Sequence, residues 1–281
     1  MPGTPASDLV ALNAAVRAPD ALRASQQPSA DGAPPNPAQG RPPYDGPMAR
    51  ASAGPAERAA RDVADAGPGE ELAAELAAWL AESSRFASFV EAHRSKIRKK
   101  LGGAADEASV RDVRAELAVA RLLLTDRRFE LTFEAYGRGG GPDFTVTYRA
   151  GRPFNLEVTR PRRPPDAAVV AGVVLGKLRQ LPPSSPNILL VAVEDAADAV
   201  DVGGAVRALR ARADGKDQGY FAFRGIDGTR TFYERLLRLG GVIVWCETAV
   251  GDRRAAWWKN GSARIAVPEA ATRAVLACLR A

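Results

Sequence analysis

The chain has 281 residues, a formal net charge of +6 and a pI near 9.6. This moderately basic balance suits a polyanionic partner, and it suits a solvated basic surface equally well. Two cysteines cannot make a zinc site alone, and the single histidine gives them little help. No apolar run approaches the ~20 residues of a membrane span. The N-terminus lacks the charged-then-apolar pattern of a secretory signal, so we expect a cytoplasmic protein.

Proline is concentrated at the N-terminal end of the chain. Twelve of the 21 prolines fall within residues 1–68, where the only aromatic residue is Tyr44. A segment this poor in apolar surface cannot offset the entropy lost on ordering, so we predict that residues 1–68 are disordered. The rest divides into a helical lead-in over 69–105 and a domain over 106–281, which is long enough to bury one core.

Apolar residues at helical spacing predict two helices in the lead-in. The first covers 70–82, and the second begins at the capping pair Ser83-Ser84 and ends at Gly102-Gly103. The second helix ends in the basic run 93–100. That run either contacts phosphate groups or is a solvated helix end whose cations complement the helix dipole.

A third helix begins after Asp106 and runs to about Thr125. Its second half is apolar nearly all round, so the helix must be largely enclosed. Glu116 lies at the edge of this apolar stretch, where a lone buried carboxylate is costly. It therefore pairs with an arginine such as Arg121, stays at a solvated rim, or helps to bind a metal.

Strict alternation of apolar and polar residues predicts three strands, over 129–136, 143–149 and 154–159. The second and third strands form a hairpin. A three-residue loop with Gly151 at positive φ pairs Asp143 with Thr159, and Thr145 with Glu157. This register gathers the apolar side chains on one face and brings two carboxylates together on the other.

The remaining elements alternate between helix and strand. We predict helices over 166–181, 201–213 and 229–239, strands over 187–193 and 242–246, a closing hairpin around 257–261, and a final helix from Pro268. The strand at 187–193 has no polar alternation, which is typical of a strand covered on both faces. The sequence therefore predicts an α/β fold with a mixed β-sheet flanked by helices.

Four features follow one another along the chain: a helix with Glu116, the strand start Pro142-Asp143-Phe144, the strand segment Glu157-Val158-Thr159, and a helix with Lys177 and Gln180. This ordered set resembles the PD-(D/E)XK, or restriction-endonuclease-like, nuclease superfamily. The resemblance implies a restriction-endonuclease-like core and Mg²⁺ (or Mn²⁺) bound by Asp143 and Glu157, with Glu116 as a further ligand. It also implies nucleic acid, DNA in the first place, as the substrate.

The chain departs from the family pattern at Thr159, where the family has a lysine. In some branches a lysine of the following helix takes over, and Lys177 is in that position here. Gln180 resembles a helix glutamine seen in nuclease branches. A threonine hydroxyl carries no charge and can only orient a water, so either Lys177 or Arg160 supplies the cation or the site is catalytically weak or inactive.

Three hypotheses follow for the function. The first is a divalent-metal-dependent nuclease. The second is a catalytically inactive protein of the same fold that binds nucleic acid or, through its long N-terminal region, a protein partner. In the third, the acids are structural, with Asp143 capping a turn and Glu157 paired with Arg149 or Arg160. The sequence leaves both a monomer and a homodimer open.

Overall fold

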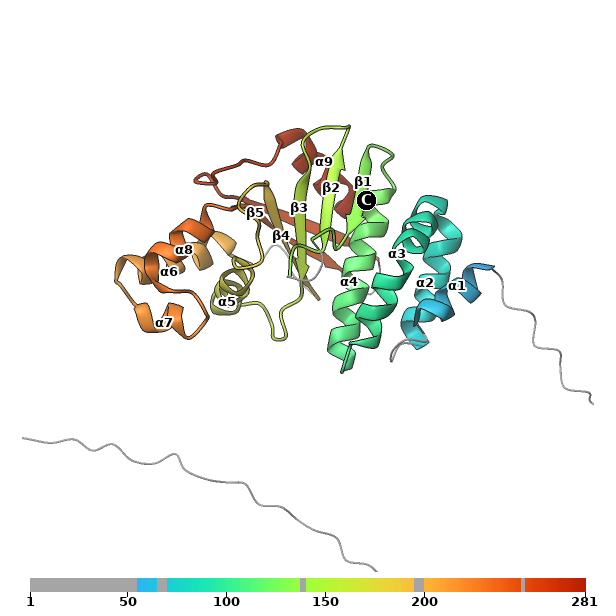
Figure 1. Cartoon of the computed structure of the whole chain (residues 1–281), viewed down its shortest axis with the longest axis horizontal. Helices are drawn as coiled ribbons and strands as arrows, with labels where there is room; N and C mark the ends of the chain where they lie inside the picture. Colours follow the sequence, from blue (N-terminus) through green and yellow to red (C-terminus); the bar gives the residue numbers. More distant parts are fainter. Residues whose placement is uncertain (1–54, 65–69, 137–139, 195–199, 249–250) are drawn as a thin grey trace, which may run out of the picture. The chain divides into compact units, whose positions relative to one another are not determined.

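The computed structural model describes residues 55–64, 70–136, 140–194, 200–248 and 251–281 (Figure 1). This part of the chain contains one six-stranded sheet and nine helices. The helices are α1 (Pro55–Ala64), α2 (Glu70–Glu82), α3 (Ser84–Gly102), α4 (Glu107–Leu124), α5 (Ala167–Lys177), α6 (Val202–Asp214), α7 (Gln218–Ala222), α8 (Gly228–Leu236) and α9 (Glu269–Arg280). The strands are β1 (Phe129–Phe133), β2 (Phe144–Tyr148), β3 (Phe154–Thr159), β4 (Asn187–Val193), β5 (Leu239–Glu247) and β6 (Arg253–Lys259).

The strands lie in sequence order across the sheet, from β1 to β6. The pairs β1–β2, β2–β3 and β5–β6 are antiparallel, whereas β3–β4 and β4–β5 are parallel. Each parallel step needs a long crossover. Helix α5 makes the first, and helices α6, α7 and α8 lie within the second. The α/β class and the mixed sheet predicted from the sequence are therefore confirmed.

Two apolar cores lie on the two faces of the sheet. Alternate residues of β4 enter different cores: Ile188 and Leu190 join the core built with α1–α4 and α9, while Leu189 and Val191 join the core built with α5–α8. All seven residues of β4 are buried, which confirms that this strand is covered on both faces. The helices flank the sheet in the same two groups (Figure 1).

Helix α1 lies within the segment that the sequence predicts to be disordered. Its residues Ala60 and Val63 are buried against α2 and α3, and Asp62 forms ion pairs with Arg94 and Arg98 of α3. Small apolar side chains thus give this short helix a packing face. The prediction of disorder missed it because that prediction relied on the scarcity of aromatic residues in the segment. Residues 1–54 and 65–68 of the same predicted segment lie outside the described residues.

Most helix starts agree with the prediction, and several ends do not. Ser83 and Asp106 cap α3 and α4 by accepting hydrogen bonds from backbone N–H groups three residues on. Helix α5 stops at Lys177, so Gln180 lies in the turn that follows, where its N–H donates to the Lys177 carbonyl. Strand β5 begins at Leu239 and not at the predicted residue 242, so Gly240 and Gly241 belong to it, and α7 was not predicted at all.

The hairpin register differs from the predicted one by two residues. The structure pairs Phe144 with Leu156 and Thr145 with Asn155, so one further step places Asp143 opposite Glu157. The loop covers residues 149–153, and its tight turn has positive φ at Arg149 and Ala150 instead of Gly151. A shift of two residues leaves every side chain on its predicted face, because the side-chain period of a strand is two.

Candidate functional site

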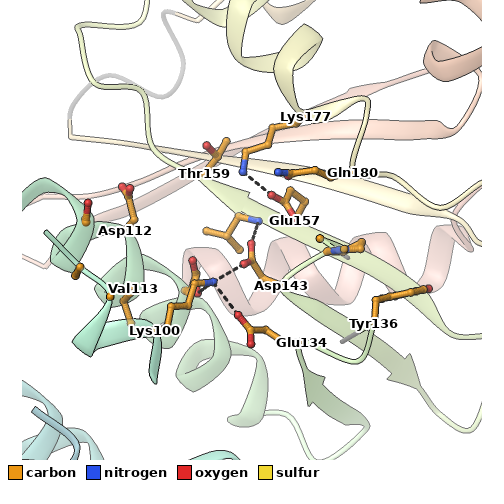
Figure 2. A pocket seen from close by; sticks show the side chains of 18 residues that line it. Lys100, Asp112, Val113, Glu134, Tyr136, Asp143, Glu157, Thr159, Lys177 and Gln180 are labelled. Atoms are coloured by element: carbon orange, nitrogen blue, oxygen red, sulfur yellow. Dashed lines mark hydrogen bonds and ion pairs between the residues drawn. The ribbon is translucent and has the colours of Figure 1, made fainter. Parts of the chain in front are cut away.

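A pocket of about 760 Å³ opens beside the start of the central hairpin (Figure 2). It is lined by all five residues that the sequence predicts for the site, which are Glu116, Asp143, Glu157, Lys177 and Gln180. Lys100, which was not among the predicted site residues, also lines the pocket. The side chains therefore come from helices α3 and α4, the hairpin, α5 and the turn after α5.

The hairpin positions the two strand acids. Asp143 immediately precedes β2, and its Oδ2 accepts a hydrogen bond of 2.8 Å from the backbone N–H of Val158 in β3. This bond ties the side chain of Asp143 to the strand that carries Glu157. Both residues are buried, with 8% and 3% of their surface exposed. The predicted convergence of these two carboxylates on one side of the hairpin agrees with this geometry.

Glu116 lies on α4, which packs against β1 and β3, and only 5% of its surface is exposed. Its Oε2 lies 2.7 Å from Nζ of Lys100. Arg121 does not pair with it, because the guanidinium of Arg121 faces Glu82 and Glu247. The structure therefore contradicts both the arginine pairing and the solvated rim, and it gives Glu116 a lysine partner instead. A role of Glu116 in metal binding stays a prediction.

Lys100 bridges the acids from the end of α3. Besides its contact with Glu116, its Nζ lies 2.8 Å from Oδ1 of Asp143 and 3.6 Å from Oε1 of Glu134. Figure 2 shows its ammonium group between the side chains of Asp143 and Glu134. The basic run 93–100 is thus not wholly solvated, and not all of its cations are free to contact phosphate groups, because Lys100 is paired with acids.

A signal for Lys100 is present in the sequence. Lys100 lies three residues after Ile97 and next to Leu101, both buried, so it borders the apolar stripe of α3. Lys96 is also turned toward the protein, and its Nζ donates to the carbonyls of Phe133 and Glu134. Helical spacing could have separated these inward lysines from the exposed Lys99.

Lys177 reaches the second acid. Its Nζ lies 2.6 Å from Oε1 of Glu157, as the predicted role of this lysine requires. Arg160, the alternative source of a cation, is instead paired with Asp112 at 3.4 Å and Glu194 at 2.9 Å. The pairing of Glu157 with Arg149 or Arg160 that the structural hypothesis requires is therefore wrong.

Burial and charge shift the ionisation of these groups. Burial, the charge of Asp143 and the proximity of Glu157 raise the pKa of Glu116 well above its usual value, although Lys100 opposes the shift. Burial and the charge of Asp143 raise the pKa of Glu157 to about 7, against the lowering effect of Lys177. Burial lowers the pKa of Lys100, but the charges of Glu116 and Asp143 outweigh it and raise that pKa above its usual value. Lys100 is therefore charged at neutral pH.

The donor set suits a hard divalent cation. Mg²⁺ and Mn²⁺ prefer carboxylate oxygens, and three of the five acidic residues that line this pocket are buried, namely Glu116, Asp143 and Glu157. Oε2 of Glu116, Oε2 of Glu157 and Oε1 of Gln180 are buried without a hydrogen-bond partner, so the contact between Glu116 and Lys100 is an ion pair only. Within the described ranges no three Asp, Glu, His or Cys side chains are already arranged to hold a metal ion. Two ammonium groups occupy positions beside the acids instead.

Comparisons with known proteins add no assignment: no family model, curated protein or solved structure matches the chain. In the part of the chain that the structure describes, no helix is long and apolar enough to cross a membrane. The interpretation of the site therefore rests on its own geometry and chemistry.

Proposed function

We propose that this protein hydrolyses phosphodiester bonds in nucleic acid, DNA in the first place, with Mg²⁺ or Mn²⁺ bound by Asp143, Glu157 and Glu116. The observation that carries the proposal is the convergence of three buried carboxylates and two ammonium groups in one open pocket. The order of these residues along the chain and the mixed sheet are compatible with a restriction-endonuclease-like core, which is part of the same proposal.

Each residue has a part in this chemistry. Hydrolysis joins a water oxygen to phosphorus and breaks one ester P–O bond, and the two water protons end on the released hydroxyl and on the phosphate product. A bound divalent cation supplies Lewis acidity and a water of lowered pKa. The carboxylates hold that cation, Lys177 fixes the orientation of Glu157 and offers a positive charge near the phosphate, and Gln180 offers an amide for positioning.

The size of the pocket suits a phosphodiester, and its excess of acidic residues over lysines means that an anionic substrate would need a bound cation there. Its volume of about 760 Å³ admits a nucleotide unit, and the hydroxyl of Thr159 and the carboxylate of Asp112 lie on its wall. Asp112 holds Arg160 and Arg162 by ion pairs of 3.4 and 2.8 Å. Both arginines line a separate pocket beside this one, and a bound phosphate would compete with their acidic partners for them.

A second candidate function is non-catalytic binding of nucleic acid by the same fold. Two observations favour it: a threonine stands at position 159, and each strand acid already has an ammonium partner. In this alternative the lysines are permanent counter-ions and the pocket binds no divalent cation. The two candidate functions differ in their need for a metal ion, because only DNA cleavage requires Mg²⁺ or Mn²⁺.

A cleavage assay tests the proposal. We expect the purified full-length chain to nick supercoiled plasmid or degrade single-stranded DNA with Mg²⁺ or Mn²⁺, and not with EDTA. Asp143→Ala and Glu157→Ala should lower the rate at least 100-fold, since removing a metal ligand removes the charge that stabilises the transition state. Glu130→Gln, which changes an exposed acid of β1 outside the pocket, should cleave like the wild type.

Equal cleavage by Asp143→Ala and wild-type protein would reject the assignment of the site. DNA binding without metal-dependent cleavage would favour the non-catalytic alternative.

A further inference from the structure

Lys100 occupies the position between two acids that the proposed function gives to a metal ion. Its Nζ forms an ion pair with Glu116 at 2.7 Å and donates a hydrogen bond of 2.8 Å to Asp143, an ordinary length for a charge-assisted hydrogen bond. These two oxygens belong to the carboxylates proposed to bind the divalent cation. Lys177 differs, because among the described residues it pairs with a single acid, Glu157, and does not bridge two.

We propose that, in the metal-free protein, the ammonium group of Lys100 takes the place of the divalent cation between Glu116 and Asp143. When the ion binds, the ammonium group moves away from these acids and turns to the substrate phosphate. The inference rests on the proposed function and names a further residue of the same site. It also supplies the positive charge that Thr159 cannot provide.

Charge favours an exchange. An ammonium group and a divalent cation repel each other when both lie close to the same two oxygens in a partly buried site, so the ion is bound more tightly when the ammonium moves away. The divalent ion carries twice the charge of the ammonium and prefers carboxylate oxygens. The deprotonated acids therefore bind the divalent ion more strongly than they bind the ammonium group.

The surroundings of Lys100 allow its side chain to move while its helix stays fixed. Lys96, one turn earlier, anchors the end of α3 to the carbonyls of Phe133 and Glu134 at 2.8 and 2.9 Å. The side chain of Lys100 is 27% exposed at the pocket and has four rotatable methylene groups. Movement therefore needs side-chain rotation only.

Glu134 offers the ammonium group of Lys100 a position nearer to solvent. Its carboxylate is 3.6 Å from the ammonium of Lys100 and 39% exposed, so it lies nearer to solvent than Asp143 or Glu116. The ring of Phe133 also lies 5.3 Å from the ammonium, within the range of a cation–π interaction. These groups can hold the displaced charge at the pocket, where a substrate phosphate would attract it.

The test compares Mn²⁺ binding by calorimetry in metal-free wild-type protein, Lys100→Met and Lys99→Met. Lys99→Met is the matched control, because it removes the same charge from the neighbouring, exposed position of α3. We expect Lys100→Met to bind Mn²⁺ at least tenfold more tightly than the wild type, and Lys99→Met to bind within twofold of it. At saturating Mn²⁺, Lys100→Met should nevertheless cleave DNA at least tenfold more slowly. A merely structural role would not combine tighter metal binding with slower cleavage.

Equal or weaker Mn²⁺ binding by Lys100→Met, with measurable binding by the wild type, would overturn the inference about Lys100 and leave the proposed function standing. Absence of Mn²⁺ binding in wild type and variant alike would contradict the proposed function itself.

A second measurement uses the wild-type chain and does not depend on the folding of a variant. Labelling with an amine-reactive ester, read by mass spectrometry, should increase severalfold at Lys100 when Mn²⁺ is added and stay constant at Lys99. No increase at Lys100 under conditions that saturate the site contradicts the exchange.

Discussion

At the scale of single residues, Glu157 lies in surroundings that favour its protonated form. Burial removes the water that would solvate its charge, and the neighbouring carboxylate of Asp143 repels it. Lys177 offsets only part of this effect, so the pKa stays at about 7 compared with 4.5 in an unperturbed side chain. The metal-free protein therefore keeps a proton on Glu157 at pH values where the unfolded chain has lost it.

This difference predicts a pH dependence of stability. Between pH 4.5 and about 7 the folded state holds a proton that the unfolded state has released, so the free energy of unfolding falls as the pH rises through this window. The contribution of Glu157 is at most about 3 kcal/mol. In EDTA, Glu157→Gln should lose less stability than the wild type over the same range, as measured by urea unfolding at several pH values. Glu130→Gln serves as the control, and identical pH profiles for wild type and Glu157→Gln contradict the assigned environment.

The site residues were predictable to different degrees. Asp143 and Glu157 follow from alternation alone, because any register that keeps the apolar face intact puts both acids on the opposite face. Lys177 follows only from the order of residues along the chain. Lys100 was missed because a dense basic run suggests a solvated surface, although the spacing of Ile97 and Leu101 shows which lysine borders the apolar stripe.

At the scale of elements, the hairpin shows what periodicity cannot decide. Two registers that differ by two residues satisfy the same alternation, so only the turn distinguishes them. The turn has positive φ at Arg149 and Ala150, and the N–H of Gly151 donates to the carbonyl of Tyr148 at 3.0 Å. Such turns are usually signalled by Asn-Gly or Asp-Gly, and Arg-Ala gives no such signal. The observed register places Asp143 directly opposite Glu157, which favours a shared ligand.

A pair of buried asparagines joins the hairpin to β4. The amide of Asn155 donates to Oδ1 of Asn187 at 2.8 Å, and Nδ2 of Asn187 contacts the carbonyls of Pro182, Ser185 and Arg238 at 2.8–2.9 Å. Both side chains are almost fully buried. These bonds fix the point at which β3 and β4 begin their parallel pairing, and they determine where Glu157 lies in the strand.

Asn187→Ala should therefore destabilise the protein by about 3 kcal/mol, because it leaves the amide of Asn155 and buried carbonyls without partners. Urea unfolding followed by tryptophan fluorescence measures this loss. The double variant with Asn155→Ala should cost less than the sum of the two single variants, since each side chain loses the same bond. A change below 0.5 kcal/mol in Asn187→Ala would show that these bonds are not needed.

At the scale of the whole molecule, the pocket lies where elements of both helical groups approach the sheet. Lys100 and Glu116 come from the group that contains α3 and α4, whereas Lys177 comes from α5 on the other side of the chain's central hairpin. The class of fold and most elements followed from periodicity and capping. The grouping of Lys100, Glu116 and Lys177 around one pocket did not follow from the sequence patterns, because it depends on how helices far apart in the sequence pack against one hairpin.

The same arrangement gives the central claim its most direct test, which is diffraction from crystals of the full-length chain soaked in Mn²⁺. We expect an anomalous peak at metal–oxygen bonding distance from the carboxylates of Asp143 and Glu157, with the ammonium of Lys100 moved away from Asp143. A fully soaked crystal with no peak at these acids, and with Lys100 still between Asp143 and Glu116, would contradict it.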